Sequence, residues 1–168
     1  MYQRVAPLGY QQITSLGSAV GLTLPLGAQQ AQATACSLAG AILTVGGTVT
    51  GTFVIGQTVT GTGILANTAI LRRLTASTWL LSQACTTESS ETVTAYAPTG
   101  VNFAVMGCTG ANVVWRDDGT APTPSVGMPM LVTSPLFEYG GPLAVIQFIA
   151  ASGSPVLNIS YYSLSGGS

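Results

Sequence analysis

The feature that most constrains the fold of this chain is a long stretch without any charged residue, from Val5 to Leu71. Gly, Thr, Gln, Ser and Pro interrupt the stretch throughout, so it contains no run of about 18 apolar residues that could form a membrane-spanning helix. No segment shows a sustained helical stripe, and short runs such as Leu22-Thr23-Leu24 alternate as half-buried strands do. The stretch therefore predicts short strands joined by tight turns, with an uncharged surface and no membrane partner.

The same shortage of charge extends over the whole chain. Its 168 residues include four arginines, five acidic residues, no lysine and no histidine, and the formal net charge is −1. Charged residues make up 5% of the chain, whereas soluble domains carry about 25%. Such a molecule has little self-repulsion to keep copies apart, and it lacks the lysines that commonly protect sheet edges. We therefore expect its surface to be covered by other subunits.

Two textures alternate along the chain. Residues 36–97 are rich in Thr and Gly, in the near-repeating phrases Gly47–Thr52 and Gln57–Gly63. Residues 1–35 and 98–168 share another texture, and only together do they supply the roughly six to eight strands of a sandwich. We therefore expect an all-β fold in which a β-sandwich (jelly-roll-like) base, residues 1–35 plus 98–168, is interrupted by a small inserted β-barrel-like module, residues 36–97.

Two local assignments stay open at this level. The segment 28–38 has a composition that a helix tolerates but no amphipathic face, which favours strand or loop. The last strand alternates, and its pattern allows either of two sets of side chains to face the core: Leu157, Ile159 and Tyr161, or Asn158, Ser160 and Tyr162.

The three cysteines, Cys36, Cys85 and Cys108, form no CxxC motif and have no histidine beside them. Residues 1–10 lack the charged-then-apolar layout of a signal peptide. We expect reduced, buried thiols in a cytoplasm. A Cys36–Cys85 disulfide stays open, because the sequence does not give their separation.

Catalytic chemistry has few candidates in this chain. General acid–base catalysis uses His, Lys or paired carboxylates, and only carboxylates are present. Asp117 and Glu138 are conceivable as a glycosidase pair. Acids before a glycine, as in Asp117-Asp118-Gly119, are more typical of a turn, and two acids are too few for a calcium loop. The sequence predicts a non-enzyme without catalytic residues, cofactor or metal.

Nucleic-acid binding is also disfavoured. Arg72-Arg73 is the only basic pair, and a nucleic-acid site needs a clustered basic patch. We expect the pair to lie at a solvated strand edge that resists wrong strand pairing.

Several stretches resemble a known family. The run Asn112–Pro129 resembles a segment of small virion-associated proteins of tailed bacteriophages, and Ala6–Ile13 and Leu157–Tyr162 resemble the two ends of those proteins. The segment Gly56–Ile64 looks like a Thr/Gly module of phage tail and head proteins. The resemblance implies a structural component of the particle.

What the resemblance implies about function is a capsid decoration (cement) protein that binds and stabilises the assembled head. Its partners would be copies of itself, a trimer being favoured, and the major capsid protein or other virion proteins. It would be located in the virion, after assembly in the bacterial host cytoplasm. The alternatives are a neck or tail accessory or fibre component, and a host-surface glycan-binding module that stacks sugars on Trp79 and Tyr96.

Aromatic and arginine side chains are enriched at protein interfaces and at their energetic hot spots. They are equally suited to a core, so the sequence alone does not separate the two roles. The candidates for subunit contacts are Trp115, Arg116, Asp117, Tyr139, Tyr161 and Tyr162.

Overall fold

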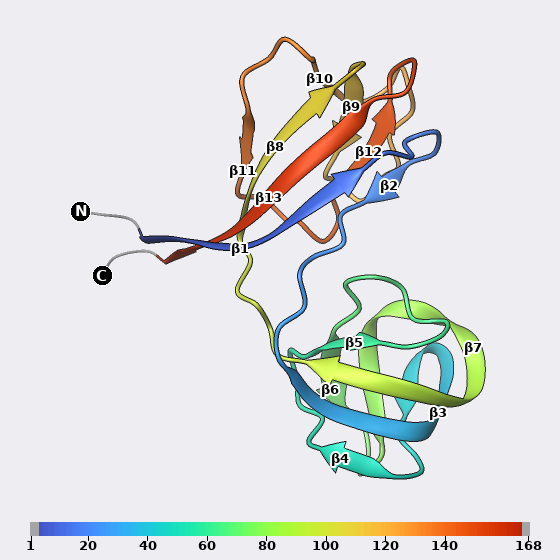
Figure 1. The fold of residues 1–168 in the computed structure, drawn as a ribbon. Coiled ribbons are helices and arrows are strands. Elements are labelled where there is room, and N and C mark those ends of the chain that lie inside the picture. Colours follow the sequence, from blue (N-terminus) through green and yellow to red (C-terminus); the bar gives the residue numbers. More distant parts are fainter. Residues whose placement is uncertain (1–3, 166–168) are drawn as a thin grey trace. The chain divides into compact units, whose positions relative to one another are not determined.

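The computed structural model describes residues 4–165, and within that range the chain is all-β, with thirteen strands and no helix (Figure 1). The predicted fold class is confirmed. In the described part of the chain there is accordingly no helix that could cross a membrane. The chain divides into two compact units: the sandwich unit, which runs up to Pro25 and resumes at Gly100, and the inserted unit, Leu26–Thr99.

The boundary of the inserted unit lies ten residues earlier than the change in sequence texture at residue 36. Residues 26–35 belong with the insertion because Gln29 begins a single strand that continues to Thr44. The first residues of this strand already pair within the inserted unit, Ala33 with both Val49 and Val93. The expected start at residue 36 therefore falls in the middle of a strand.

The sandwich unit contains two four-stranded sheets in which all strand pairs are antiparallel. The first sheet has the order β1-β13-β8-β11 and the second β10-β9-β12-β2. Both sheets therefore mix strands from before and after the insertion. The strands of the first sheet are β1 (Arg4–Ile13), β13 (Val156–Ser165), β8 (Phe103–Thr109) and β11 (Phe137–Tyr139); those of the second are β10 (Met128–Met130), β9 (Val113–Arg116), β12 (Gln147–Ala150) and β2 (Val20–Gly21).

One core lies between these two sheets. In β13 the side chains of Leu157, Ile159 and Tyr161 are buried, so this set faces the core and the other set faces out. Phe148 of β12 is also buried and is the largest fully buried side chain from the second sheet. Burying such a side chain contributes about 1.5–3 kcal/mol relative to leaving it in water. The sequence did not show which set of β13 side chains faces the core. The position of the second sheet decides it.

The inserted unit is built on two long antiparallel strands, β3 (Gln29–Thr44) and β7 (Thr78–Tyr96). Shorter strands pair along them: β4 (Val49–Gly51) with β3, and both β5 (Thr58–Thr60) and β6 (Ile70–Arg73) with β7. The single strand β7 includes both Thr78–Ser82 and Glu91–Tyr96.

Bulges bend both long strands. The register between β3 and β7 shifts repeatedly from Ala33 to Ile42. Ala35 and Ser90 have φ angles of 52° and 61°, the left-handed region that residues other than glycine rarely adopt. Figure 1 shows both strands curling around the unit. The sheet nevertheless remains open and does not close into the expected barrel.

A buried glutamine anchors one loop of the inserted unit. Gln57 is 1% exposed, and its Nε2 donates to Gln30 Oε1 at 2.8 Å and to the Thr52 carbonyl at 3.1 Å. Its Oε1 accepts the Val54 N–H at 2.8 Å. Because a buried amide is costly unless it is hydrogen-bonded, these three bonds are what make its burial tolerable.

Candidate interaction surface

Three aromatic side chains from the two sheets pack together at one side of the sandwich unit. Trp115 lies on β9, whereas Phe137 and Tyr139 lie on β11. The Trp115 ring centroid is 5.0 Å from that of Phe137 and 6.0 Å from that of Tyr139. These distances lie within the range of favourable aromatic contacts, about 4.5–7 Å. The cluster therefore joins β11, the edge strand of the first sheet, to the second sheet.

A hydrogen bond fixes the inner member of this cluster. Tyr139 is buried, and its hydroxyl donates to Asp117 Oδ2 at 2.9 Å. Burial raises the pKa of the Tyr139 hydroxyl far above its usual value, and the neighbouring Asp117 carboxylate raises it further. Asp117 and Tyr139 were both candidates for subunit contacts. In the structure they are hydrogen-bonded to each other within one chain.

The strand β10 and the segment that joins it to β11 expose large apolar side chains. The exposed fractions are 57% for Met128, 43% for Leu131, 44% for Val132 and 70% for Leu136; these four residues are called the apolar rim below. Leu136 lies against the outer face of the first sheet, where a Cβ on Gly107 would come within 3.0 Å of Leu136 Cδ2. The absence of a side chain at Gly107 therefore makes room for the rim.

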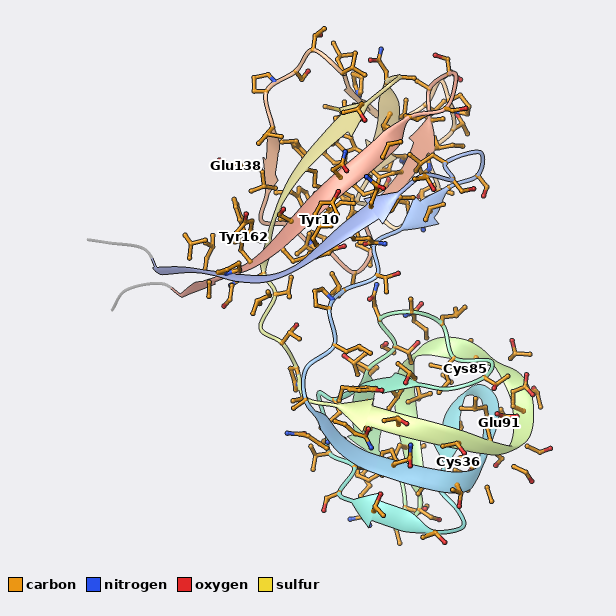
Figure 2. The ribbon with its side chains drawn as sticks, viewed as in Figure 1. Tyr10, Cys36, Cys85, Glu91, Glu138 and Tyr162 are labelled. Atoms are coloured by element: carbon orange, nitrogen blue, oxygen red, sulfur yellow. The ribbon has the colours of Figure 1, made fainter. Side chains whose placement is uncertain are left out.

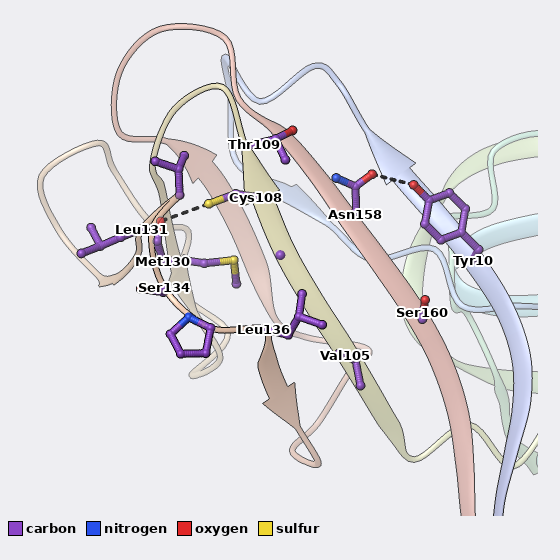
Figure 3. A pocket seen from close by; sticks show the side chains of 13 residues that line it. Tyr10, Val105, Cys108, Thr109, Met130, Leu131, Ser134, Leu136, Asn158 and Ser160 are labelled. Carbon is purple, nitrogen blue, oxygen red and sulfur yellow. Dashed lines mark hydrogen bonds between the residues drawn. The ribbon is translucent and has the colours of Figure 1, made fainter.

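A groove of about 290 Å³, called the outer groove, runs across the first sheet beside the rim (Figure 3). Leu136 lines one side and Tyr10, which is 62% exposed, lines the other. The Tyr10 hydroxyl donates to Asn158 Oδ1 at 2.5 Å, and Gln12 Nε2 donates to the same oxygen at 2.9 Å. The residues that line this groove carry no charge.

A second hollow, the aromatic groove, lies on the other side of the rim and has a volume of about 370 Å³. Trp115, Met128 and Phe137 line it, and it lies between the edge strands β10 and β11. Glu138, exposed on β11, is the only charged residue in its lining (Figure 2). Leu136 of the apolar rim thus lines both hollows, the uncharged outer groove and the aromatic groove.

The Arg116 side chain, at the end of β9, is hydrogen-bonded to the loop that follows the strand. Its Nε donates to Asp118 Oδ1 at 3.2 Å and its guanidinium also contacts the other carboxylate oxygen. Asp118 further accepts the Thr120 N–H at 3.0 Å. These hydrogen bonds lower the pKa of the Asp118 carboxyl, but the pair is solvent-exposed and stabilises the fold little. Arg116 is thus the last residue of β9, and its side chain is paired with Asp118 of the same chain.

The two neighbouring tyrosines on β13 occupy different places. Tyr161 is 1% exposed in the core, and its hydroxyl donates to Gln11 Oε1 at 2.5 Å. It cannot reach a partner from there, so its assignment as a surface anchor is wrong. Tyr162 is half-buried on the opposite face of β13, with its ring centroid 6.3 Å from that of Phe103.

The acid pair considered from the sequence does not form a catalytic arrangement. Asp117 bonds to Tyr139, which points to the core side of β11, whereas Glu138 is exposed on the other side. Among residues 4–165 no group of three His, Cys, Asp or Glu side chains is placed to hold a metal ion.

Trp79, a candidate for stacking against a sugar in the inserted unit, does not form an exposed platform. Trp79 is only 7% exposed, and the Arg73 guanidinium lies 5.3 Å from its ring centroid. Arg73 also donates to the carbonyls of Thr75 and Ala76 at the following turn. Little of the Trp79 ring is left for a sugar. Arg72 and Arg73 are both exposed on β6, which lies at an edge of the sheet.

All three cysteines are free and buried, as the sequence predicted, and Cys36 and Cys85 form no disulfide. Burial raises the pKa of the Cys85 and Cys108 thiols. These side chains therefore serve as small apolar packing groups.

Sequence reasoning did not identify the apolar rim. In the sequence, Leu131, Val132 and Leu136 stand among prolines and show no alternation that separates exposed from buried positions. The signal that could have indicated a surface role is the clustering of apolar residues in a proline-rich connection, which cannot form an inner strand.

Comparisons of the chain with protein-family models, with curated proteins and with solved structures found no match.

Proposed function

We propose that this chain is a non-catalytic structural subunit of a tailed-bacteriophage particle, a decoration (cement) protein that binds the assembled head. The observation that carries the proposal is the apolar rim, whose four large side chains are 43–70% exposed. Exposed apolar patches of this kind are typical of protein interaction sites.

The rest of the surface fits a protein partner. Covering apolar area contributes about 25 cal/mol per Å², and little charge has to be desolvated when the outer groove is covered as well. The partners are copies of the chain and the major capsid protein or other virion proteins. Binding to the closed shell stabilises that shell by mass action, because the subunit binds the assembled lattice and not its separated parts.

The residues that could serve an enzyme or a sugar-binding module are engaged within the chain. Asp117 is engaged by Tyr139, and the Trp79 ring is covered by Arg73. A neck or tail position involves the same kind of contacts, and the copy number per particle separates it from the head: hundreds of copies support shell decoration, a dozen or fewer support neck or tail.

The test is reconstitution on particles that lack the protein. We expect the purified chain to bind these particles and to raise their heat tolerance. Leu136→Asp is expected to lower the occupancy strongly, whereas Ile55→Asp, a matched change at a residue 62% exposed in the inserted unit, leaves it near the original level. Particles that form normally and are equally robust without the protein would overturn the decoration role.

A further inference from the structure

The strands at the two ends of the described chain extend beyond the sheet that supports them. β8 pairs with β13 only from Val156 to Tyr162. The pairing of β1 with β13 continues further, through Ala6 with Ser163, Val5 with Leu164, and Arg4 with Ser165. This two-stranded extension, Arg4–Ala6 with Ser163–Ser165, is called the terminal arm.

The terminal arm is not paired with β8; there it is supported by the side chain of Asn102, which is hydrogen-bonded to the Leu164 backbone. A two-stranded ribbon is marginally stable in water unless something packs against it. Val5 is 54% exposed, and it stands directly opposite Leu164. The arm thus carries an apolar cross-strand pair without a sheet neighbour at β8.

The aromatic groove has the complementary properties. It is lined by Trp115, Met128 and Phe137, and it lies between β10 and β11, which are both edge strands of three residues. Edge strands offer backbone groups to an added strand, and the groove offers pockets for its side chains. Its volume of about 370 Å³ is near the lower end of ordinary ligand sites, which suits a few side chains.

The charges of the two surfaces are opposite. Arg4 is the only charged residue in the sequence of the terminal arm. Glu138 is the only charged residue that lines the aromatic groove. In a chain with 5% charged residues, an arm whose sequence contains one arginine and a groove lined by one glutamate favour a single way of docking.

We infer that the terminal arm of one copy binds in the aromatic groove of a second copy, an inference that rests on the proposed role as a structural subunit. The arm belongs to β1 and β13, whereas the groove begins beyond β11 at the opposite edge of the first sheet. Two different surfaces therefore meet, so two copies can exchange arms reciprocally, or each copy can pass its arm to the next in a ring or a chain.

Charge reversal in the full-length chain tests this contact. Arg4→Glu and Glu138→Arg are each expected to weaken self-association at least about tenfold, measured by light scattering across a dilution series, and the double variant restores it. Arg72→Glu and Glu91→Arg make the same charge changes in the inserted unit and leave association unchanged. Circular dichroism checks that each variant is folded.

A cross-link gives a second, independent measurement. Val5→Cys and Met128→Cys are prepared as separate proteins and then mixed under oxidising conditions. A disulfide-linked pair that forms rapidly in the mixture, and not with either protein alone, supports the contact. Single reversals that match their controls, a double variant that fails to recover, or a chain that is monomeric at all concentrations would overturn it. Binding to particles is measured separately, so failure of the arm contact is distinguishable from failure of the decoration role.

Discussion

The side chain of Asn102 takes the place of a strand neighbour beside Leu164. Its Nδ2 donates to the Leu164 carbonyl at 3.0 Å, and its Oδ1 accepts the Leu164 N–H at 2.7 Å. One amide side chain thus satisfies both backbone groups of a residue that lies beyond the end of β8.

Replacing Asn102 tests how much this pairing stabilises the terminal arm. Asn102→Ala removes both hydrogen bonds, each worth about 0.5–1.5 kcal/mol, so we expect a loss of about 1–2 kcal/mol in the free energy of unfolding. Amide hydrogen exchange at Leu164 is expected to accelerate more than at Ile159 in the core of the same strand. Equal protection of Leu164 in both proteins would show that the pairing contributes nothing.

Two glycines in the inserted unit give a matched pair of substitutions. Gly40 and Gly51 have φ angles of 56° and 74°, but a Cβ on Gly40 meets open space, whereas one on Gly51 lies 2.0 Å from the Gln30 carbonyl oxygen. Gly40→Ala is expected to cost about 1–2 kcal/mol for the backbone conformation alone. Gly51→Ala is expected to lower the free energy of unfolding clearly more, because its Cβ also has to displace β3. Chemical denaturation of both variants checks the order, and similar costs would contradict it.

The two buried tyrosines predict a loss of stability at high pH. Burial raises the pKa of Tyr161, and burial with the Asp117 hydrogen bond raises that of Tyr139, in the folded state. A group with a raised folded pKa contributes stability that is present below its unfolded pKa, about 10, and is lost as the pH rises above it. Tyr139→Phe is therefore expected to flatten the decline in unfolding free energy between pH 9 and 11. A decline that is as steep in Tyr139→Phe as in the unchanged chain would contradict this prediction.

The buried thiols predict slow chemical modification. Cys36, Cys85 and Cys108 are all buried, and burial raises the pKa of Cys85 and Cys108, so few thiolates are exposed at neutral pH. We expect a thiol-specific reagent to label the native chain slowly and all three residues quickly in denaturant. Rapid labelling of a folded sample would show that the units open readily.

The sequence was sufficient for the fold class because the evidence for strands is local. The absence of a helical stripe and the alternation at Leu157, Ile159 and Tyr161 depend only on neighbouring residues, and the structure uses both. The prediction of a closed barrel was wrong because closure depends on where the long strands bend. Those bends occur at Ala35 and Ser90, whose residue types give no sign of a left-handed conformation.

The candidate surface was less accessible from the sequence. Trp115 and Tyr139 were selected from the sequence as separate candidates for subunit contacts, and the structure shows that their rings pack together. The groove lined by Trp115 could not be predicted, because Leu136, which also lines it, comes from a connection without periodicity. Tyr161 was misassigned because the alternation along its strand does not show which set of side chains faces the core. That is decided only by the position of the facing sheet.

The inserted unit leaves the chain almost where it enters. Gln29 and Tyr96 are paired across β3 and β7, and Ala97 donates its N–H to the Ala28 carbonyl at 2.9 Å. Paired residues on antiparallel strands are only about 5 Å apart, so a short linker would span the gap if the unit were excised. The coding sequence of the unit could therefore be deleted, or inserted at another exposed loop, without breaking the fold of the host domain. The host domain would keep its own connectivity and its own core.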